Sequence, residues 1–271
     1  MTVPPHDDHL LEAGGIVVEW CGADGEPVVT VTLDRPETLN SQNASTWAAL
    51  AHIGEHLPES TRVVIVRGGG SNFSSGLDRS AFDPEKTDSE LNLFKLAESA
   101  PHEIDAKIAE FQSGFTWLRA STSVVTIAAV DGAAVGAGFQ LALACDLRVA
   151  TPAARFSMRE PALGLVPDLT GTHPLVRLVG YARALEICAT SRWVHADEAL
   201  ALGLVNAVSP DGRLETALDP LVKHLLTVSP TALSETKALL SLAEQSTADE
   251  QHAHERAAQT RVMKAMRAQR A

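Results

Sequence analysis

Short apolar runs that end in glycine recur along the chain, and they constrain its fold more than any other feature. Two of them, TRVVIVRGGG at 61–70 and SVVTIAAVDG at 123–132, are continuous enough to be buried strands. A third run, CDLRVAT at 145–151, has the same character. Stretches with helical spacing lie between these runs, at 43–57 and 104–119. This alternation predicts an α/β fold in which parallel strands are joined by crossover helices.

The chain before and after this core has a different character. Residues 1–14 are acidic and lack the apolar stretch of a signal peptide, so we expect a flexible lead-in without one. The β-rich runs at 15–20 and 27–34 flank the turn CGADGE and predict a hairpin. From about Val194 onward we expect strands to cease and helices to follow. The predicted organisation is a flexible lead at 1–14, an α/β core at 15–205 and a helical region at 206–271.

Composition and spacing argue against several classes of protein. The 34 acidic residues outnumber the 22 Lys and Arg residues, and the net charge of −12 argues against a nucleic-acid partner. No apolar run reaches the roughly 18 residues of a membrane span. Cys21, Cys145 and Cys188 form neither a disulfide framework nor a zinc spacing, which fits the reducing cytoplasm. His252 and His254 fall on different faces of a predicted helix, so we expect no metal site.

Two glycine-bearing turns follow predicted strands: GGGSNFSSGLD at 68–78 and DGAAVGAG at 131–138. They match neither the dinucleotide pattern GxGxxG nor the phosphate loop GxxxxGK[ST], and the chain has no GxSxG serine-hydrolase elbow. Two interpretations stay open. The segments can be simple strand-to-helix turns, or they can face one another and each offer one N–H to a carbonyl oxygen. Such a pair of amides would stabilise the enolate that forms when a thioester loses its α-proton.

That reaction needs a base, and two carboxylates follow the second turn. Glu160 lies in FSMREPALGLVPD, and Asp168 ends the same segment. Spacing alone favours simpler roles, namely an exposed loop carboxylate for Glu160 and a helix N-cap for Asp168. The alternative is that Glu160 is a general base whose pKa is raised by an apolar pocket.

Four ordered motifs resemble those of the crotonase superfamily, the enoyl-CoA hydratases and isomerases. VTLDRPETLNSQN is similar to the family's LxRPxxxNA entry, and NFSSGLD to its FxxGxD segment. IAAVDGAAVGAGFQLALACDLRVA resembles the AxxxGxxxGGGxxLxxxCDxRxA block, and ADEALALGLVNAV the AxEAxxxGLVxxV block. The resemblance extends from about Gly15 to about Leu240. It implies a spiral core of ββα turns, C-terminal helices that close an acyl pocket, and a homotrimer or a dimer of trimers.

The resemblance also implies which residues form the site. The oxyanion amides would be those of Leu77, after Gly76, and of Ala137, where family members usually have glycine. Alanine still supplies an N–H, so this difference does not remove the donor. The residues that would line the path of CoA and the thioester are Leu39, Ser75, Gly76, Asp78 and Gly136. No metal, nucleotide or flavin is expected, and coenzyme A enters only as part of the acyl-CoA substrate.

The acidic positions of the motif separate the possible reactions. Gln140 occupies the place of the first of the two glutamates of hydratases, and Glu160 matches the second. An amide cannot titrate, so Gln140 can orient water or substrate but cannot be a base. Asp168 falls where dienoyl-CoA isomerases of the superfamily carry an aspartate. Superfamily dehalogenases use an aspartate nucleophile there, but they generally place an aromatic residue where this chain has Glu160.

We therefore expect an enzyme that moves a double bond within an unsaturated acyl-CoA. Glu160 would remove a proton, the amides of Leu77 and Ala137 would hold the enolate, and Asp168 would return a proton at a more distant carbon. Two alternatives remain: a hydratase in which Gln140 orients water, and a catalytically weak acyl-CoA-binding protein.

Overall fold

A six-stranded sheet forms the centre of the protein. The computed structural model describes residues 7–20, 27–86 and 91–268, and its large sheet has the order β1-β2-β4-β6-β8-β11. The strands of this sheet are β1 (Ile16–Glu19), β2 (Val28–Leu33), β4 (Val63–Gly68), β6 (Val125–Val130), β8 (Leu147–Ala150) and β11 (Ala207–Val208). Two smaller sheets contain β3 (Ser41–Gln42) with β5 (Gly76–Leu77), and β10 (Val194–His195), β9 (Arg155–Ser157) and β7 (Ala133–Val135).

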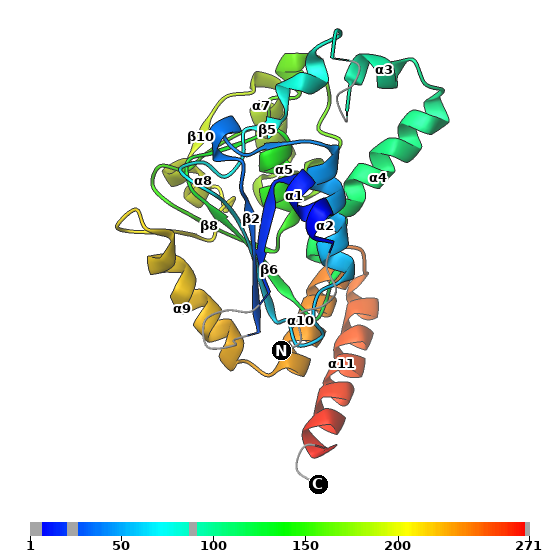
Figure 1. Ribbon diagram of the computed structural model, residues 1–271. Helices are drawn as coiled ribbons and strands as arrows, with labels where there is room; N and C mark the ends of the chain where they lie inside the picture. Colours follow the sequence, from blue (N-terminus) through cyan, green and yellow to red (C-terminus); the bar gives the residue numbers. More distant parts are fainter. Residues whose placement is uncertain (1–6, 21–26, 87–90, 269–271) are drawn as a thin grey trace.

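Helices surround these sheets, as Figure 1 shows. The α-helices are α1 (Asp8–Gly14), α2 (Ala44–Glu55), α3 (Leu93–Ala97), α4 (Pro101–Ala120), α5 (Ala137–Ala144), α6 (Thr172–Val179), α7 (Tyr181–Thr190), α8 (Ala196–Ala201), α9 (Leu214–Thr227), α10 (Pro230–Ala243) and α11 (Ala248–Ala268). The 3-10 turns are η2 (Pro36–Thr38), η3 (Arg79–Phe82) and η4 (Pro161–Leu163). The predicted α/β class is confirmed.

Strand direction follows the sequence pattern. β1 pairs with β2 antiparallel, which confirms the predicted hairpin, although its turn at 21–26 lies outside the described residues. The other adjacent pairs of the large sheet are parallel. Every residue of β6 is buried, as expected for a parallel strand that is covered on both faces.

Alternate side chains of the large sheet enter two separate cores. Val64 and Val66 of β4 pack with side chains of α2, α4 and α5. Val63 and Ile65 point to the opposite face, where they pack with Leu218 of α9. Figure 1 shows α9 and α2 on opposite sides of the sheet. The period of two along the strands therefore produces three layers, with helices on both faces.

The chain repeats one structural unit: a strand of the large sheet, a short strand of a small sheet, and a helical segment. The units are β2-β3-α2, β4-β5 with α3 and α4, β6-β7-α5, and β8-β9 with α6 and α7. A parallel bridge between Ser74 and Ala134 links the two small sheets. The predicted ββα spiral is confirmed. The short strands follow the carboxyl ends of the parallel strands, which is where open α/β sheets bind ligands.

Two expectations about the ends of the core are wrong. Residues 8–14, expected to belong to a flexible lead, form α1. Asp7 caps this helix by accepting a hydrogen bond from Leu10 N, Gly15 ends it in the left-handed conformation, and Leu11 is buried. Strands also continue beyond residue 194, because β10 pairs with β9 and β11 pairs with β8. Both late strands have only two residues, too short to show a period in the sequence.

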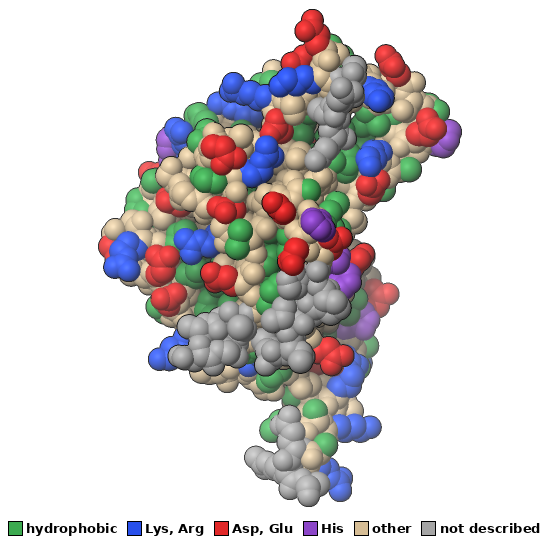
Figure 2. Space-filling view, in the orientation of Figure 1, with side chains coloured by type: hydrophobic (Ala, Val, Ile, Leu, Met, Phe, Trp, Pro, Cys, Tyr) green, Lys and Arg blue, Asp and Glu red, His purple; other side chains and the backbone are tan. Residues whose placement is uncertain are grey.

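The C-terminal region is helical, as expected, from α9 to α11. α9 covers the sheet, whereas α11 extends away from the body of the protein in Figure 1. On the face shown in Figure 2, acidic and basic side chains are intermixed. Within the described residues, no helix combines the length and apolar character needed to span a membrane.

Candidate active site

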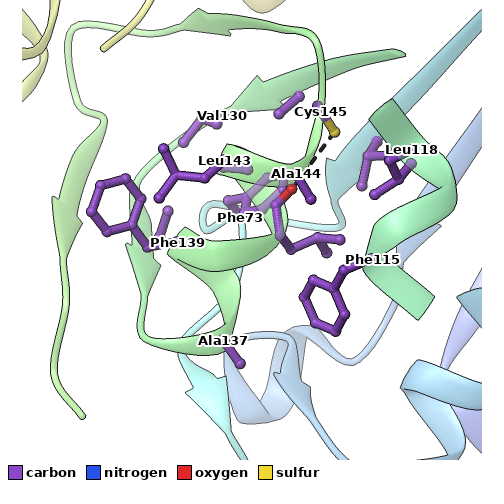
Figure 3. Close-up of a cluster of buried hydrophobic side chains, with 14 of the residues drawn as sticks. Phe73, Phe115, Leu118, Val130, Ala137, Phe139, Leu143, Ala144 and Cys145 are labelled. Carbon is purple, nitrogen blue, oxygen red and sulfur yellow. Dashed lines mark hydrogen bonds between the residues drawn. The ribbon is translucent and has the colours of Figure 1, made fainter. Parts of the chain in front are cut away.

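The first part of the site is the N-terminus of α5. Gly136 precedes this helix with a φ of +51°, and Ala137 is its first residue. The Ala137 N–H therefore has no acceptor within the helix. All eight residues of α5 are buried, and Figure 3 shows the apolar side chains around them. The helix is thus a rigid support for its first amide groups.

The second part is the turn at Gly76 and Leu77, which β3 and β5 hold beside the first. Gly76 has a φ of +85°, and a Cβ at this position would lie 2.5 Å from the Val135 carbonyl oxygen. The same Cβ would lie 3.4 Å from the main-chain nitrogen of Ala137. Only glycine permits this approach. The two turns that the sequence singled out therefore meet, one at the end of β5 and one at the start of α5.

Glu160 lies beside this junction. It follows β9, is only 9% exposed, and has Oε1 and Oε2 at 3.2 and 3.6 Å from the position that a Cβ on Gly136 would occupy. The interpretation as an exposed loop carboxylate is therefore wrong. Oε1 accepts a hydrogen bond of 2.6 Å from Gln140 Nε2, while Oε2 is buried without a hydrogen-bond partner among the described residues.

The surroundings of Glu160 favour its neutral form. Burial raises the pKa of this carboxyl group, the nearby charge of Asp168 raises it further, and the hydrogen bond from Gln140 opposes the shift. A carboxylate whose pKa is moved toward neutrality is a more effective proton acceptor and donor.

Gln140 lies behind Glu160 and has no exposed surface. Its Oε1 accepts hydrogen bonds from the main-chain nitrogens of Leu169, at 2.8 Å, and Gly171, at 3.2 Å. The side chain therefore joins Glu160 to the loop that carries Asp168. We expected Gln140 among the substrate-binding residues, and the structure places it one layer behind the surface of the site.

Asp168 belongs to the same loop and is partly buried. Its carbonyl oxygen accepts a hydrogen bond of 2.7 Å from Gln112 Nε2 on α4, and burial raises the pKa of its carboxyl group. The interpretation as a helix N-cap is wrong, because α6 begins at Thr172 and Gly171 is its N-cap. Asp168 instead acts electrostatically on Glu160.

Two of the residues expected along the CoA path, Leu39 and Ser75, lie beside the turn at Gly76 and Leu77. Ser75 donates hydrogen bonds through its N–H to Leu39 O, at 2.9 Å, and through its hydroxyl to Thr38 O, at 3.1 Å. Leu39 has a φ of +57° and is 52% exposed, so its side chain is free to meet a ligand.

Asp78 is bound by protein groups on the other side of this turn. Burial raises the pKa of its carboxyl group, but hydrogen bonds from Ser80 and Ser41 and the guanidinium of Arg35 lower it to about 2. Arg35 Nη2 lies 3.1 Å from Asp78 Oδ2. Asp78 is thus an ionised anchor of the turn.

Two further residues near the site were not assigned to it from the sequence. Gln112 holds the Asp168 loop from α4. Cys188 on α7 is partly buried, and burial, followed by the charge of Glu160, raises the pKa of its thiol. Both belong to helices whose spacing shows only which side faces the core. A polar residue on the inner face of α4 was the only hint for Gln112.

Comparisons with known proteins show the family and the fold. The model of the enoyl-CoA hydratase/isomerase family matches residues 24–270. A peroxisomal Δ(3,5)-Δ(2,4)-dienoyl-CoA isomerase of Arabidopsis thaliana is 31% identical over 79% of this chain and 77% of that protein. A candidate enoyl-CoA hydratase of Thermobifida fusca, solved with acetoacetyl-CoA, is 43% identical over 97% of this chain and 99% of its own, with a TM-score of 0.88.

Some relatives are much longer. The peroxisomal β-oxidation multifunctional protein MFP2 of Arabidopsis thaliana is 32% identical over 74% of this chain, and the match covers 26% of that protein. The chain thus spans about a quarter of this relative's length.

Proposed function

Because the chain belongs to the enoyl-CoA hydratase/isomerase family, we propose that it is an enzyme that isomerises the double bond of an unsaturated acyl-CoA. The observation that carries the proposal is the position of Glu160. This buried carboxylate lies beside Gly136, and an amide, Gln140, occupies the place of a second acid.

In the proposed mechanism the thioester oxygen accepts hydrogen bonds from the main-chain nitrogens of Leu77 and Ala137. Glu160 removes a proton from the α- or γ-carbon of the acyl chain. The electron pair of the broken C–H bond moves into the enolate, whose negative oxygen the two amides stabilise. The unpartnered Oε2 is the atom best placed to accept the proton, because Oε1 already binds Gln140.

The enolate then collapses with its double bond in a new position. A proton must be added at a different carbon, and Asp168 is the group proposed to add it. Burial raises the pKa of its carboxyl group, which favours the protonated form that such a donor needs. The main chain of the loop that carries Asp168 is linked to Glu160 through Gln140.

Hydration is the second candidate reaction, and the surroundings of Gln140 argue against it. Addition of water to a double bond ordinarily uses two carboxylates to position and split the water. Here Gln140 is fully buried, its oxygen binds two loop amides, and its Nε2 binds Glu160. Because its oxygen already accepts two hydrogen bonds and its Nε2 already donates to Glu160, Gln140 has little capacity left to orient a water molecule.

The substrate class follows from the family and from the Thermobifida protein, which binds acetoacetyl-CoA. We propose an acyl-CoA thioester as the substrate, with Leu39, Ser75, Asp78 and Gly136 along its path and no further cofactor. We also propose the trimer, or dimer of trimers, of the superfamily. The exposed apolar side chains of Tyr181 and Leu185 support an interface on α7, and analytical ultracentrifugation tests it.

The proposed function is tested by Glu160→Gln, which keeps the shape of the side chain and removes the base. Wild-type protein should isomerise 3-enoyl-CoA or 3,5-dienoyl-CoA substrates faster than it hydrates 2-enoyl-CoA. The variant should lose about 10²- to 10⁴-fold in kcat, the usual contribution of a general base. Near-normal isomerisation by the variant would remove Glu160 from this role. Faster hydration by the wild type would favour the second candidate.

A further inference from the structure

A buried polar network lies behind the turn at Gly76 and Leu77, and neither catalysis nor substrate binding uses it directly. Trp47 of α2 donates its indole N–H to Gln42 Oε1 at 2.8 Å, and Gln42 Nε2 donates to Ser74 Oγ at 3.0 Å. Trp47 is 3% exposed, and Gln42 and Ser74 have no exposed surface. Buried polar side chains in such a connected set are costly unless each one is bound, so the network specifies one arrangement.

Ser74 is the centre of this network, and every hydrogen-bonding site of its hydroxyl group is used. It donates one hydrogen bond to Asn40 O, at 2.7 Å, and accepts one each from Gln42 Nε2 and Gly76 N, at 3.0 and 3.2 Å. A serine hydroxyl has one donor and two acceptor sites. All three are used within the protein.

The same residue touches both turns of the site. Its hydroxyl binds the amide next to that of Leu77, and its main chain pairs with β7, where Ser74 N donates to Ala133 O and Val135 N donates to Ser74 O, each at 2.9 Å. α5 also rests on it, because a Cβ on Gly138 would lie 2.6 Å from Ser74 Cβ. Ser74 is therefore the point from which the Leu77 amide and the N-terminus of α5 are positioned relative to each other.

We propose that Ser74 and Gln42 are positioning residues for the oxyanion-binding amides, an inference that rests on the function proposed above. Neither side chain touches the reacting atoms. They fix the direction of the Leu77 N–H by holding Gly76 N, and they fix its distance from Ala137 through the packing of Ser74 on Gly138. If an oxyanion donor is misplaced by a fraction of an ångström, stabilisation of the transition state falls more than the affinity for the substrate does. The reason is that the enolate charge is absent from the bound substrate.

The test compares Ser74→Ala with Thr126→Ala. Thr126 is also buried, and its hydroxyl accepts from Asp146 N and donates to Leu118 O, but it lies at the far end of α5. Both variants lose a buried hydroxyl with several partners and should lose stability. For 3-enoyl-CoA, Ser74→Ala should lower kcat about tenfold or more with KM within about twofold. Thr126→Ala should keep both values.

A second readout follows the enolate itself. Bound acetoacetyl-CoA ionises to an enolate with a distinctive near-ultraviolet absorbance, and the pH at which this absorbance appears reports the strength of the oxyanion donors. We expect this pH to rise in Ser74→Ala, to recover in part in Ser74→Cys, and to be unchanged in Thr126→Ala. Gln42→Met removes the Nε2 donor while keeping a similar side-chain volume. It should raise the pH at which the enolate absorbance appears by less than Ser74→Ala does. It serves as the test variant if Ser74→Ala does not fold.

The possible results separate the two proposals. Wild-type protein that neither isomerises enoyl-CoA nor produces the enolate absorbance would overturn the proposed function and the inference with it. Wild-type protein that does both, with Ser74→Ala or Gln42→Met indistinguishable from Thr126→Ala in kcat and in the enolate absorbance, would overturn the inference alone.

Discussion

A carboxylate lies at each end of α5, partly buried at Asp146 and buried at Glu160, and the protein binds the two in opposite ways. At the C-terminal end, Asp146 Oδ2 accepts hydrogen bonds from Lys237 Nζ, at 2.6 Å, and from Thr126 N, at 2.8 Å. At the N-terminal end, Glu160 accepts one hydrogen bond, from Gln140, and its other oxygen is buried without a partner among the described residues. Oδ2 of Asp146 is thus held by Lys237 and by two groups of Thr126, whereas the buried Oε2 of Glu160 has no partner among the described residues. We call these the saturated end and the open end of α5.

The main-chain groups of the helix repeat this difference. The buried guanidinium of Arg148 donates to Cys145 O, at 2.8 Å, and to Ala142 O, at 3.3 Å, and so binds the carbonyl groups at the C-terminal end. The amide of Ala137 at the other end has no acceptor within the helix. A cation at the C-terminus stabilises the helix dipole, while the free N-terminus is suited to a developing negative charge. The polar groups at the C-terminal end are thus bound by protein groups, whereas those at the N-terminal end, which we propose to serve catalysis, are left open.

The largest expected effect tests the saturated end. Lys237→Met leaves the partly buried Asp146 without its cation and should lower the free energy of unfolding by about 2 kcal/mol, somewhat less than for a broken fully buried ion pair. Urea denaturation measures this loss, and kcat/KM of the folded variant should stay within about twofold. Lys264→Met makes the same change at an exposed position of α11 and should stay within about 0.5 kcal/mol of wild type. Equal losses in the two variants would contradict the structural role of the Lys237–Asp146 pair.

Features of the structure that depend on local sequence could be predicted, whereas those that depend on long-range contacts could not. Apolar runs and helical spacing are local, so the α/β class, the hairpin and the C-terminal helices follow from them. The ββα spiral and the site positions came from the resemblance to a family, through motifs that include the glycine turns and Glu160.

Other features of the structure depend on contacts between distant residues. Lys237 and Asp146 are 91 positions apart, and neither gives a local signal of the other. The burial of Glu160 is likewise set by the fold around it, which is why spacing alone favoured an exposed loop. The short helix α1 depends on the packing of Leu11 and the cap at Asp7, a tertiary contact and a single hydrogen bond.

A smaller effect is expected when the open end is changed by Gln140→Glu. The new carboxylate could still accept from Leu169 N and Gly171 N, but it would face Glu160 Oε1 at the 2.6 Å now occupied by a hydrogen bond. Two carboxylates this close cannot both ionise, so the pair shares a proton and its apparent pKa values move apart. The acid limb of the pH profile of kcat/KM should shift to higher pH, with about tenfold lower activity on its rising part.

The matched control is Gln245→Glu, which makes the same charge change at an exposed position after α10. Its pH profile should overlay that of the wild type. A Gln140→Glu profile that also overlays the wild type would mean that Glu160 does not titrate in the reaction. A gain of 2-enoyl-CoA hydration by Gln140→Glu would show that the amide is what suppresses water addition.

The smallest expected effect concerns the free energy of unfolding that the protein loses by burying Glu160 with one oxygen unpartnered. The folded pKa of this carboxyl group is raised by burial, so between the unfolded pKa and the folded pKa the folded state binds more protons than the unfolded state. The free energy of unfolding therefore falls as pH rises through that window, and the contribution is favourable only below it. Glu160→Gln removes this ionisation. It should stabilise the protein by about 1 kcal/mol at neutral pH, as is common for substitutions that relieve a functional site.

Unfolding of the two proteins across pH measures this effect and completes the comparison of the two ends. The advantage of Glu160→Gln should shrink as pH falls below the folded pKa and vanish below the ordinary pKa of a glutamic acid, where the wild-type carboxyl group is neutral in both states. Asp146→Asn, the same kind of change at the saturated end, weakens the contact with Lys237 and should destabilise the protein at neutral pH. Opposite signs for the two substitutions are what the proposed division of the helix requires. A loss of stability in both would mean that Glu160 is held for structure, as Asp146 is.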